Sequence, residues 1–340
     1  MTVAEHAEVA VQPALLASVR APPITYQPAL PRRVVKSGAL SDLQVEALMS
    51  AGQCHAGPLT AAGTRRGFLL ADGAGVGKGR TQAAILLDAW LQGHQRALWV
   101  SASADLLVDA RRDLEAVCTA AAGVPPLHTY LIPLTQLPLG TPIQAPRGIV
   151  FASYALLARP ARLAQVLAWC EARKAFEGVV ALDECHRAKA AGSTGAGSAV
   201  LRLQTELPLA RVVYSSATCA TELQNVEYLT RLALWGRGTP HPNFGAFREA
   251  MAAGGPAAKE LLPVHLKCDG ALLSRLISFE GVAVRVATHQ LTPAQRRLYN
   301  SSARLWLDLA RLLRRRAPLL PPSAGSRFWS AHQRFFRCLV

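Results

Sequence analysis

The stretch GFLLADGAGVGKGRT, residues 67–81, decides the fold of this chain. Its apolar start FLL, residues 68–70, is typical of a buried strand, and glycines follow it before Lys78. The segment TQAAILLDAWL, residues 81–91, then has the apolar spacing of a helix that packs on a sheet. A glycine loop between a strand and a helix is typical of phosphate binding, because its backbone N–H groups can surround phosphate oxygens and the helix N-terminus favours negative charge.

The loop predicts which residues bind a nucleotide. Lys78 is expected to reach the outer phosphates. The predicted binding residues are Gly73, Gly75, Val76, Gly77, Lys78, Gly79 and Arg80. Two positions depart from the usual pattern: Asp72 replaces the first glycine, and Gly79 replaces the serine or threonine whose hydroxyl ligates magnesium. Thr81 would point elsewhere on a helix. The alternative is a chance glycine cluster that ends in Gly-Lys.

Length and composition set the class of protein. The 340 residues are 51% hydrophobic, enough for one large core or two smaller ones, and no apolar run approaches the roughly 18 residues of a membrane span. The N-terminus lacks the basic start and apolar segment of a secretory signal. The seven cysteines form no CxxC pair, which favours a reducing compartment over a disulfide framework or a zinc site.

The chain is strongly basic, with a formal net charge of +15 from 37 basic and 22 acidic residues. Such an excess indicates a polyanionic partner such as nucleic acid. The alternative is a general bias of this sequence toward alanine and arginine. The basic residues concentrate toward the C-terminus, where residues 300–340 hold eight arginines and a single acidic residue, Asp308.

The segments before the glycine loop differ in character. Residues 1–36 contain several prolines that interrupt any helix, and they are predicted to be a flexible arm. A helix is predicted from Ser41, a suitable N-cap, and it carries Gln44. A glutamine upstream of the loop contacts the adenine base in helicase-like ATPases, whereas an isolated helix would more simply leave it in solvent.

Five short apolar strands alternate with helical patterns. They are residues 68–70, 96–101 and 148–154 and the apolar starts of VVALDECH, 179–186, and RVVYSSAT, 211–218. This alternation predicts an α/β fold whose mostly parallel sheet is covered on both faces.

Two of these strands end in residues that can carry chemistry. Asp183 and Glu184 would lie at the carboxyl edge of the sheet, where open α/β sheets bind ligands. Asp183 is predicted to hold Mg²⁺, usually through water, and Glu184 to act as the general base on an attacking water. An acidic pair that merely caps the next helix is the alternative. Ser216, Ala217 and Thr218 are by themselves ordinary turn residues.

The order of these patterns resembles that of the superfamily 2 helicase motifs Q, I, Ia, II and III. More closely, DGAGVGKGRT, RALWVSASADLLVDARRDL, ALDECHRAKA, VVYSSAT and LWGRGTPHPNF resemble segments of the strawberry notch family of helicase-related nuclear regulators. The resemblance covers about Ser37 to the C-terminus, and the GKGR form of the loop resembles the family norm. It implies a RecA-like P-loop NTPase lobe over residues 37–220 that binds ATP and Mg²⁺.

The resemblance also implies roles and partners. It assigns catalysis to Lys78, Asp183 and Glu184, contact with the adenine to Gln44, and coupling between motifs to four residues. These four are His186, Ser216, Ala217 and Thr218. It further implies nucleic acid or chromatin as a partner, contact with transcription-regulatory proteins, and a nuclear location.

Such ATPases bind ATP between two RecA-like lobes, and the second lobe supplies an arginine that stabilises the transferring phosphoryl group. Here residues 221–340 are expected to form a helical insertion or linker, without a second lobe. The predicted helices are 222–234, 244–251, 257–277, 293–316 and 328–339, with one strand-like run at 282–288.

Two functions follow from these expectations, and whether the chain hydrolyses ATP is open between them. The first is the ATP-binding half of a helicase-like, chromatin- or DNA-associated regulator of transcription. The second is a scaffold or co-regulator that binds ATP without turnover. A small-molecule P-loop kinase is disfavoured, because it would need a lid and would not explain DECH together with SAT.

Overall fold

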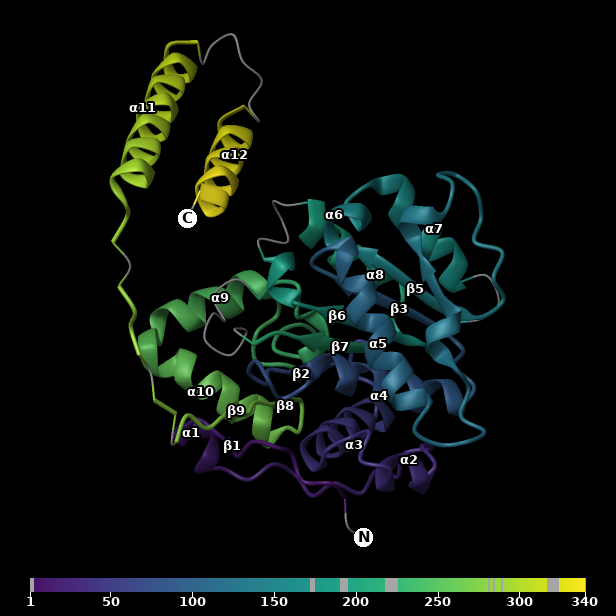
Figure 1. Cartoon of the computed structure of the whole chain (residues 1–340). Helices are drawn as coiled ribbons and strands as arrows, with labels where there is room; N and C mark the ends of the chain where they lie inside the picture. The colour runs from purple at the N-terminus through teal and green to yellow at the C-terminus, as the bar shows by residue number, and fades with distance from the viewer. Residues whose placement is uncertain are drawn as a thin grey trace. The chain divides into compact units, whose positions relative to one another are not determined.

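The computed structural model in Figure 1 describes residues 3–171, 175–189, 195–217, 226–280, 282–283, 285–288, 290–316 and 324–339. Two compact units are present, Met1–Phe279 and Glu280–Val340. In the part of the chain just given, no helix is long and apolar enough to cross a bilayer.

The first unit is built on a seven-stranded sheet in which each neighbouring pair is parallel. The strand order is β4-β5-β3-β6-β7-β2-β8. The strands are β2 (Phe68–Leu70), β3 (Arg96–Ser101), β4 (Leu131–Pro133), β5 (Gly148–Ser153), β6 (Val179–Asp183), β7 (Arg211–Ser215) and β8 (Leu272–Leu273). Parallel pairing brings their carboxyl ends to one edge, so that β2 ends between β7 and β8.

Alternate residues of the strands enter two separate cores. In β3, Ala97 and Trp99 pack into one core, while Leu98 and Val100 pack into the other. Helices cover both faces, as the sequence predicts and as Figure 1 shows. One face holds α3 (Asp42–Ala56), α4 (Lys78–Leu91) and α5 (Leu107–Cys118), and the other holds α6 (Tyr154–Leu157), α7 (Pro160–Glu171) and α8 (Gly195–Glu206). The predicted α/β class is therefore confirmed.

The five predicted strands are present, and the structure adds β4 and β8 to the same sheet. Strands of two or three residues show little pattern of their own, and the equally short β2 was predicted because a glycine loop follows it. The predicted helix 257–277 is wrong in its last part: α10 (Gly255–Cys268) ends, Gly270 adopts φ +68°, and β8 and β9 (Leu276–Ile277) follow. The first unit thus extends to Phe279, beyond the expected boundary at residue 220.

Two further sequence predictions are wrong in the residues that the structure describes. Residues 226–234 of the predicted helix 222–234 hold only a 3₁₀ turn, Thr230–Leu232. The strand-like run 282–288 forms no strand at 282–283 or 285–288. Alternating apolar residues form a strand only where a neighbouring strand can pair with them. Residues 282–283 and 285–288 pair with no strand. The helix α9 (Phe244–Ala253) matches its prediction.

Residues 3–36 are packed within the first unit, which corrects the expectation of a flexible arm. β1 (Ala10–Val11) pairs antiparallel with β9, while α1 (Ala14–Ala17) and α2 (Arg32–Lys36) bury Leu16 and Val34. Further along, the Tyr26 hydroxyl donates to Asp88 Oδ2 at 2.6 Å. Proline prevents long helices but does not prevent packing, so composition alone misjudged this segment.

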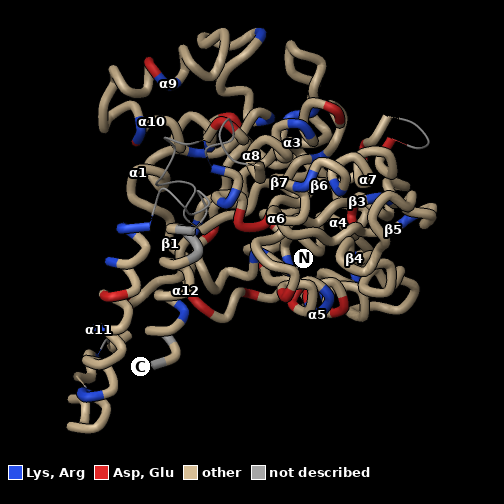
Figure 2. The backbone as a smooth tube through the Cα atoms, turned by 90° about the horizontal axis from the view of Figure 1, so that it is seen from above, with Lys and Arg blue, Asp and Glu red and all other residues tan. Residues whose placement is uncertain are grey.

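The second unit contains two amphipathic helices, α11 (Pro293–Arg315) and α12 (Ala324–Leu339), close to the helices predicted there. A capping box between Thr292 and Gln295 begins α11, and Trp306 of this helix packs against Phe328 of α12 with ring centroids 5.2 Å apart. Figure 2 shows basic residues, all of them arginines, at intervals along α11, where Asp308 is the one acidic residue.

The packing of the N-terminal segment can be tested at Gly52, in the middle of α3. A Cβ atom at this position would lie 2.1 Å from the Tyr26 ring. Gly52→Ala should therefore lower the free energy of unfolding by about 1–3 kcal/mol, despite the better helix propensity of alanine.

Equilibrium urea unfolding measures this change, with Gly57→Ala as the matched control. A Cβ at Gly57 would meet its nearest atom at an ordinary 3.4 Å, so stability should hardly change. Equal stabilities of Gly52→Ala and the wild type would show that Tyr26 does not pack on α3.

Candidate functional site

The glycine loop connects β2 to α4 with a backbone that only glycine adopts easily. Gly75 and Gly77 have φ values of +92° and +90°, in the left-handed region. Gly77 is the N-cap of α4, and no side chain caps this helix end. The first backbone N–H groups of α4 can therefore point at an anion, and the helix dipole favours one there.

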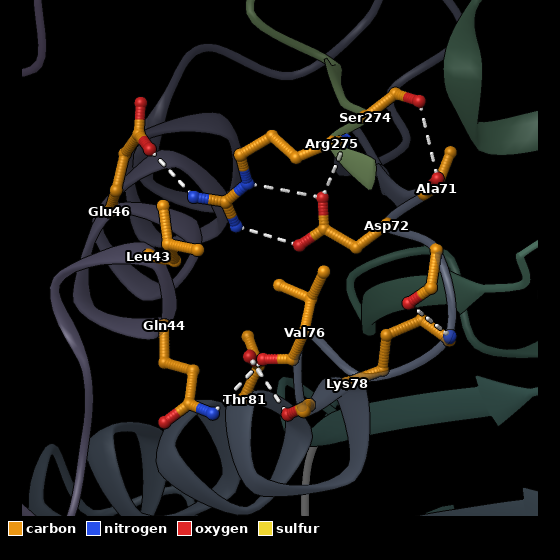
Figure 3. Close-up of polar contacts among 12 residues, drawn as sticks. Leu43, Gln44, Glu46, Ala71, Asp72, Val76, Lys78, Thr81, Ser274 and Arg275 are labelled. Carbon is orange, nitrogen blue, oxygen red and sulfur yellow. Dashed lines mark hydrogen bonds and ion pairs between the residues drawn. The ribbon is translucent and has the colours of Figure 1, made fainter. Parts of the chain in front are cut away.

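Two side chains, Lys78 at the end of the loop and Gln44 of α3, donate hydrogen bonds to carbonyl groups of the loop, as Figure 3 shows. Lys78 Nζ donates to the Gly73 carbonyl at 3.2 Å, across the loop. Gln44 Nε2 donates to the Val76 carbonyl at 3.1 Å, while its Oε1 accepts from the Ser41 N–H at 3.1 Å. The predicted contact of Gln44 with adenine would require its amide to exchange one of these partners. The structure does place Gln44 beside the glycine loop.

The first departure from the usual loop pattern has a structural partner. Asp72 is fully buried and forms an ion pair with Arg275, whose Nη2 lies 2.6 Å from Asp72 Oδ2. Arg275 precedes β9, more than 200 positions along the chain. Sequence reasoning missed this arginine, because no local pattern distinguishes it from the many others.

The acidic residues lie where the sequence predicts, at the carboxyl edge of the sheet. Asp183 ends β6 beside Ser215 of β7. Its Oδ1 accepts from Gln82 Nε2 at 3.1 Å and its Oδ2 accepts from Ser101 Oγ at 3.0 Å. Gln82 lies on α4, so this side chain links the helix after the loop to the acidic strand end. No sequence pattern pointed to Gln82 or Ser101, since both roles depend on how strands and helices align.

Glu184 and the residues that follow it form a second polar group. Glu184 is a non-glycine residue with φ +48°, a conformation that concentrates at functional sites. Its Oε2 lies 3.2 Å from His186 Nδ1, which lies 3.0 Å from Ser216 Oγ. The structure thus brings together His186 and Ser216, two of the predicted coupling residues. Ala217 adjoins them, and Thr218 lies outside the described residues.

The second departure from the loop pattern also has a partner. A Cβ atom at Gly79 would lie 2.2 Å from Oδ2 of Asp113, a residue of α5. Burial raises the pKa of Asp113, while the charges of Arg112 and Arg80 lower it. The space that serine or threonine would need is therefore taken by a carboxylate. The Thr81 hydroxyl donates back to the Gly77 carbonyl at 3.4 Å and is no substitute.

The site fits a nucleotide well and a magnesium ion in a limited way. The left-handed glycines, the uncapped helix start and Lys78 suit a polyphosphate. Asp183, the residue predicted to hold Mg²⁺, lies at the strand end, but within the described ranges no group of three or more His, Cys, Asp or Glu side chains is arranged around a metal. This arrangement suits an ion that arrives with the nucleotide, because Mg²⁺ commonly uses one or two carboxylates, substrate phosphates and water.

The contact between Gly79 and Asp113 predicts a coupling between these positions. Gly79→Ser should lower the free energy of unfolding, because its Cβ would displace the Asp113 carboxylate. Adding Asp113→Ala removes the obstacle, so the two changes should be non-additive by about 0.5–3 kcal/mol. Urea unfolding of the two single variants and the double variant gives this value.

Asp109→Ala is the matched control background, since Asp109 lies one turn earlier on α5 and pairs with Arg112 at 2.8 Å. There Gly79→Ser should cost as much as in the wild type. The same coupling for Asp109 and Asp113 would contradict the assigned contact.

Comparisons with known proteins agree with this geometry. The family model described as P-loop containing NTP hydrolase pore-1 matches residues 5–301. Protein strawberry notch homolog 2 from Homo sapiens is 43% identical over 98% of this chain, and Protein FORGETTER 1 from Arabidopsis thaliana is 39% identical over 98%. The chain spans about a quarter of these relatives, 24% and 27% of their lengths.

The solved structure of the Sulfolobus solfataricus SWI2/SNF2 ATPase core in complex with dsDNA has a similar fold. Its TM-score is 0.50 at 16% sequence identity, and the match covers 95% of this chain and 60% of that one. The expected RecA-like fold is thereby confirmed. The chain belongs to the P-loop containing NTP hydrolase pore-1 family, as a relative of the strawberry notch proteins.

Proposed function

We propose that this chain is the ATP-binding lobe of a helicase-like motor that acts on DNA or chromatin in the regulation of transcription, and that it works in the nucleus. The observation that carries the proposal is the link from α4 to Asp183 through Gln82. It connects the start of the phosphate-binding helix to the strand end that carries Asp183 and Glu184. These are the parts that phosphoryl transfer to water requires.

Each part of the site has a distinct role in this proposal. The glycine loop and Lys78 bind the phosphates and fix their position, and Asp183 would hold Mg²⁺, which neutralises charge on phosphate oxygens when it is bound. Glu184 accepts the proton of the attacking water. The His186–Ser216 contact joins this base to the end of β7. In phosphoryl-transfer enzymes such an arginine adds about 10³ to 10⁵ in rate, and in helicase-like ATPases a second lobe supplies it.

A second candidate is a scaffold that binds ATP without turnover. Gly79 favours it, because glycine has no hydroxyl to bind the metal and Asp113 Oδ2 lies 2.2 Å from where a Cβ at this position would stand. The two functions share a nucleotide site and differ in the fate of the nucleotide, so binding and hydrolysis must be measured separately.

Titration with a fluorescent ATP analogue tests binding. Lys78→Ala should weaken affinity strongly, because the lysine positions the outer phosphates. Lys259→Ala, an exposed position on α10, should bind like the wild type. Equal affinity of the wild type and Lys78→Ala would remove Lys78 from the site, and no binding by the wild type would reject the proposal.

Hydrolysis by these 340 residues alone should be slow, because no second lobe is added to supply the stabilising arginine. Glu184→Gln should abolish whatever rate is present. A measurable rate that Glu184→Gln leaves unchanged would show that Glu184 is not the general base, whereas ATP binding with no measurable hydrolysis would favour the scaffold.

Nucleic-acid binding is the second part of the proposal, supported by the charge of +15 and by the DNA-bound state of the Sulfolobus relative. Affinity should fall with salt by about 0.9 log units per log unit for each phosphate neutralised on duplex DNA. Replacing the exposed Arg314, Arg315 and Arg316 of the second unit by glutamine should flatten this slope.

The matched control replaces three exposed basic residues of α2, Arg32, Arg33 and Lys36, and so removes the same charge. Salt titrations of a labelled duplex compare the two variants. Equal salt slopes for the two variants would show that the basic residues contribute in the same way wherever they lie, without a defined binding surface. An affinity that is independent of salt would reject nucleic acid as the partner.

A further inference from the structure

Arg275 is a charged side chain beside the glycine loop that is bound at every nitrogen of its guanidinium group. Its Nη2 and Nε hold Asp72 Oδ2 and Oδ1 at 2.6 and 3.1 Å, and its backbone N–H donates to Oδ1 at 2.9 Å. Its Nη1 reaches Glu46 Oε2 of α3 at 2.7 Å. The side chains of Arg275 and Asp72 are 3% and 1% exposed, and Figure 3 shows the fork between them.

The residues around Arg275 also cover the loop. The Gly73 N–H donates to the Arg275 carbonyl at 2.7 Å, and Ser274 Oγ donates to the Ala71 carbonyl at 3.2 Å. A Cβ at Gly73 would lie 2.8 Å from Leu276 Cδ2, and one at Gly75 would lie 3.3 Å from Ile277 Cγ1. Residues 274–277 therefore lie against the loop from its start to Gly75.

The charge of Asp72 makes this contact more than packing. Asp72 stands in the loop at the position where glycine is usual, close to where a polyphosphate would bind. An unpaired carboxylate there would repel the phosphates, and at this depth the repulsion would be weakly screened. Arg275 cancels that charge through a two-pronged ion pair, which also fixes the direction of the carboxylate.

We propose that Arg275 is a positioning residue for the glycine loop: it neutralises Asp72, holds the start of the loop in its phosphate-binding shape, and couples that shape to β9. β9 pairs with β1, with Ala10 opposite Ile277, and it lies at the end of the first unit. A nucleotide on the loop and an ordered β1–β9 ribbon should therefore stabilise each other, since coupling between two sites is reciprocal. This inference rests on the proposed binding of ATP.

Hydrogen exchange in the protein without nucleotide tests the structural part. Arg275→Ala should speed exchange of the amides at 73–77 and in β1 and β9, because a buried ion pair that loses one partner leaves an uncompensated charge. The matched control is Arg66→Ala, which removes the ion pair between Arg66, just before β2, and Asp269, just before β8, 2.5 Å apart. The Arg66–Asp269 and Arg275–Asp72 ion pairs both join the β2 segment to the β8 segment, but only Arg275 lies at the glycine loop.

Titration with the fluorescent ATP analogue tests the functional part. Arg275→Ala and Arg275→Gln should weaken binding about tenfold or more, Arg275→Lys should be intermediate, and Arg66→Ala should bind like the wild type. Asp72→Asn combined with Arg275→Gln should recover much of the affinity lost in Arg275→Gln, because it removes the unpaired carboxylate.

The outcomes separate this inference from the proposed function. If the wild type binds no nucleotide, the proposed function fails, and exchange at the loop still decides whether Arg275 positions it. Equal effects of Arg275→Ala and Arg66→Ala on loop exchange would overturn the inference, since Arg275 would then only hold β8 on β2. If the double variant, Asp72→Asn with Arg275→Gln, regains no affinity over Arg275→Gln alone, the charge argument is rejected.

Discussion

The pairing of β2 between β7 and β8 is the constraint on which the rest of the structure depends. β2 has three residues, and its register sets Leu70 beside Ser215 on one side and Leu273 on the other. The glycine loop therefore begins with Ser216 on one side and Arg275 on the other. A shift of this register by one residue would exchange the two faces of β2 and separate all of these groups.

Asp183 connects the parts of the candidate site across the sheet. One oxygen of its carboxylate accepts from α4 and the other from β3, while the Tyr154 hydroxyl of α6 donates to its backbone carbonyl at 2.9 Å. A carboxylate held in this way has its orientation fixed before any ligand arrives, which lowers the entropic cost of binding. The neighbouring Glu184, with its side chain 37% exposed, is left accessible to water.

The two departures from the usual loop pattern have the same kind of explanation. Asp72 is compensated by Arg275, and Gly79 leaves room for Asp113. Both partners lie outside the loop in the sequence: Arg275 balances the charge of Asp72, and Asp113 occupies the space beside Gly79. The two unusual residues of the loop are therefore matched by their surroundings. The candidate site is built from three segments of the chain: the loop, the segment around Arg275, and α5.

The sequence by itself determined the α/β class, five of the seven strands of the sheet, the glycine loop and the acidic strand end, because hydrophobic periodicity and glycine chemistry act over short stretches. Only the tertiary structure decided that residues 3–36 pack on the lobe, that β8 extends the sheet, and that Arg275, Asp113 and Gln82 join the site. These features depend on contacts between segments far apart in the chain, and no local pattern records which arginine or aspartate will meet the loop.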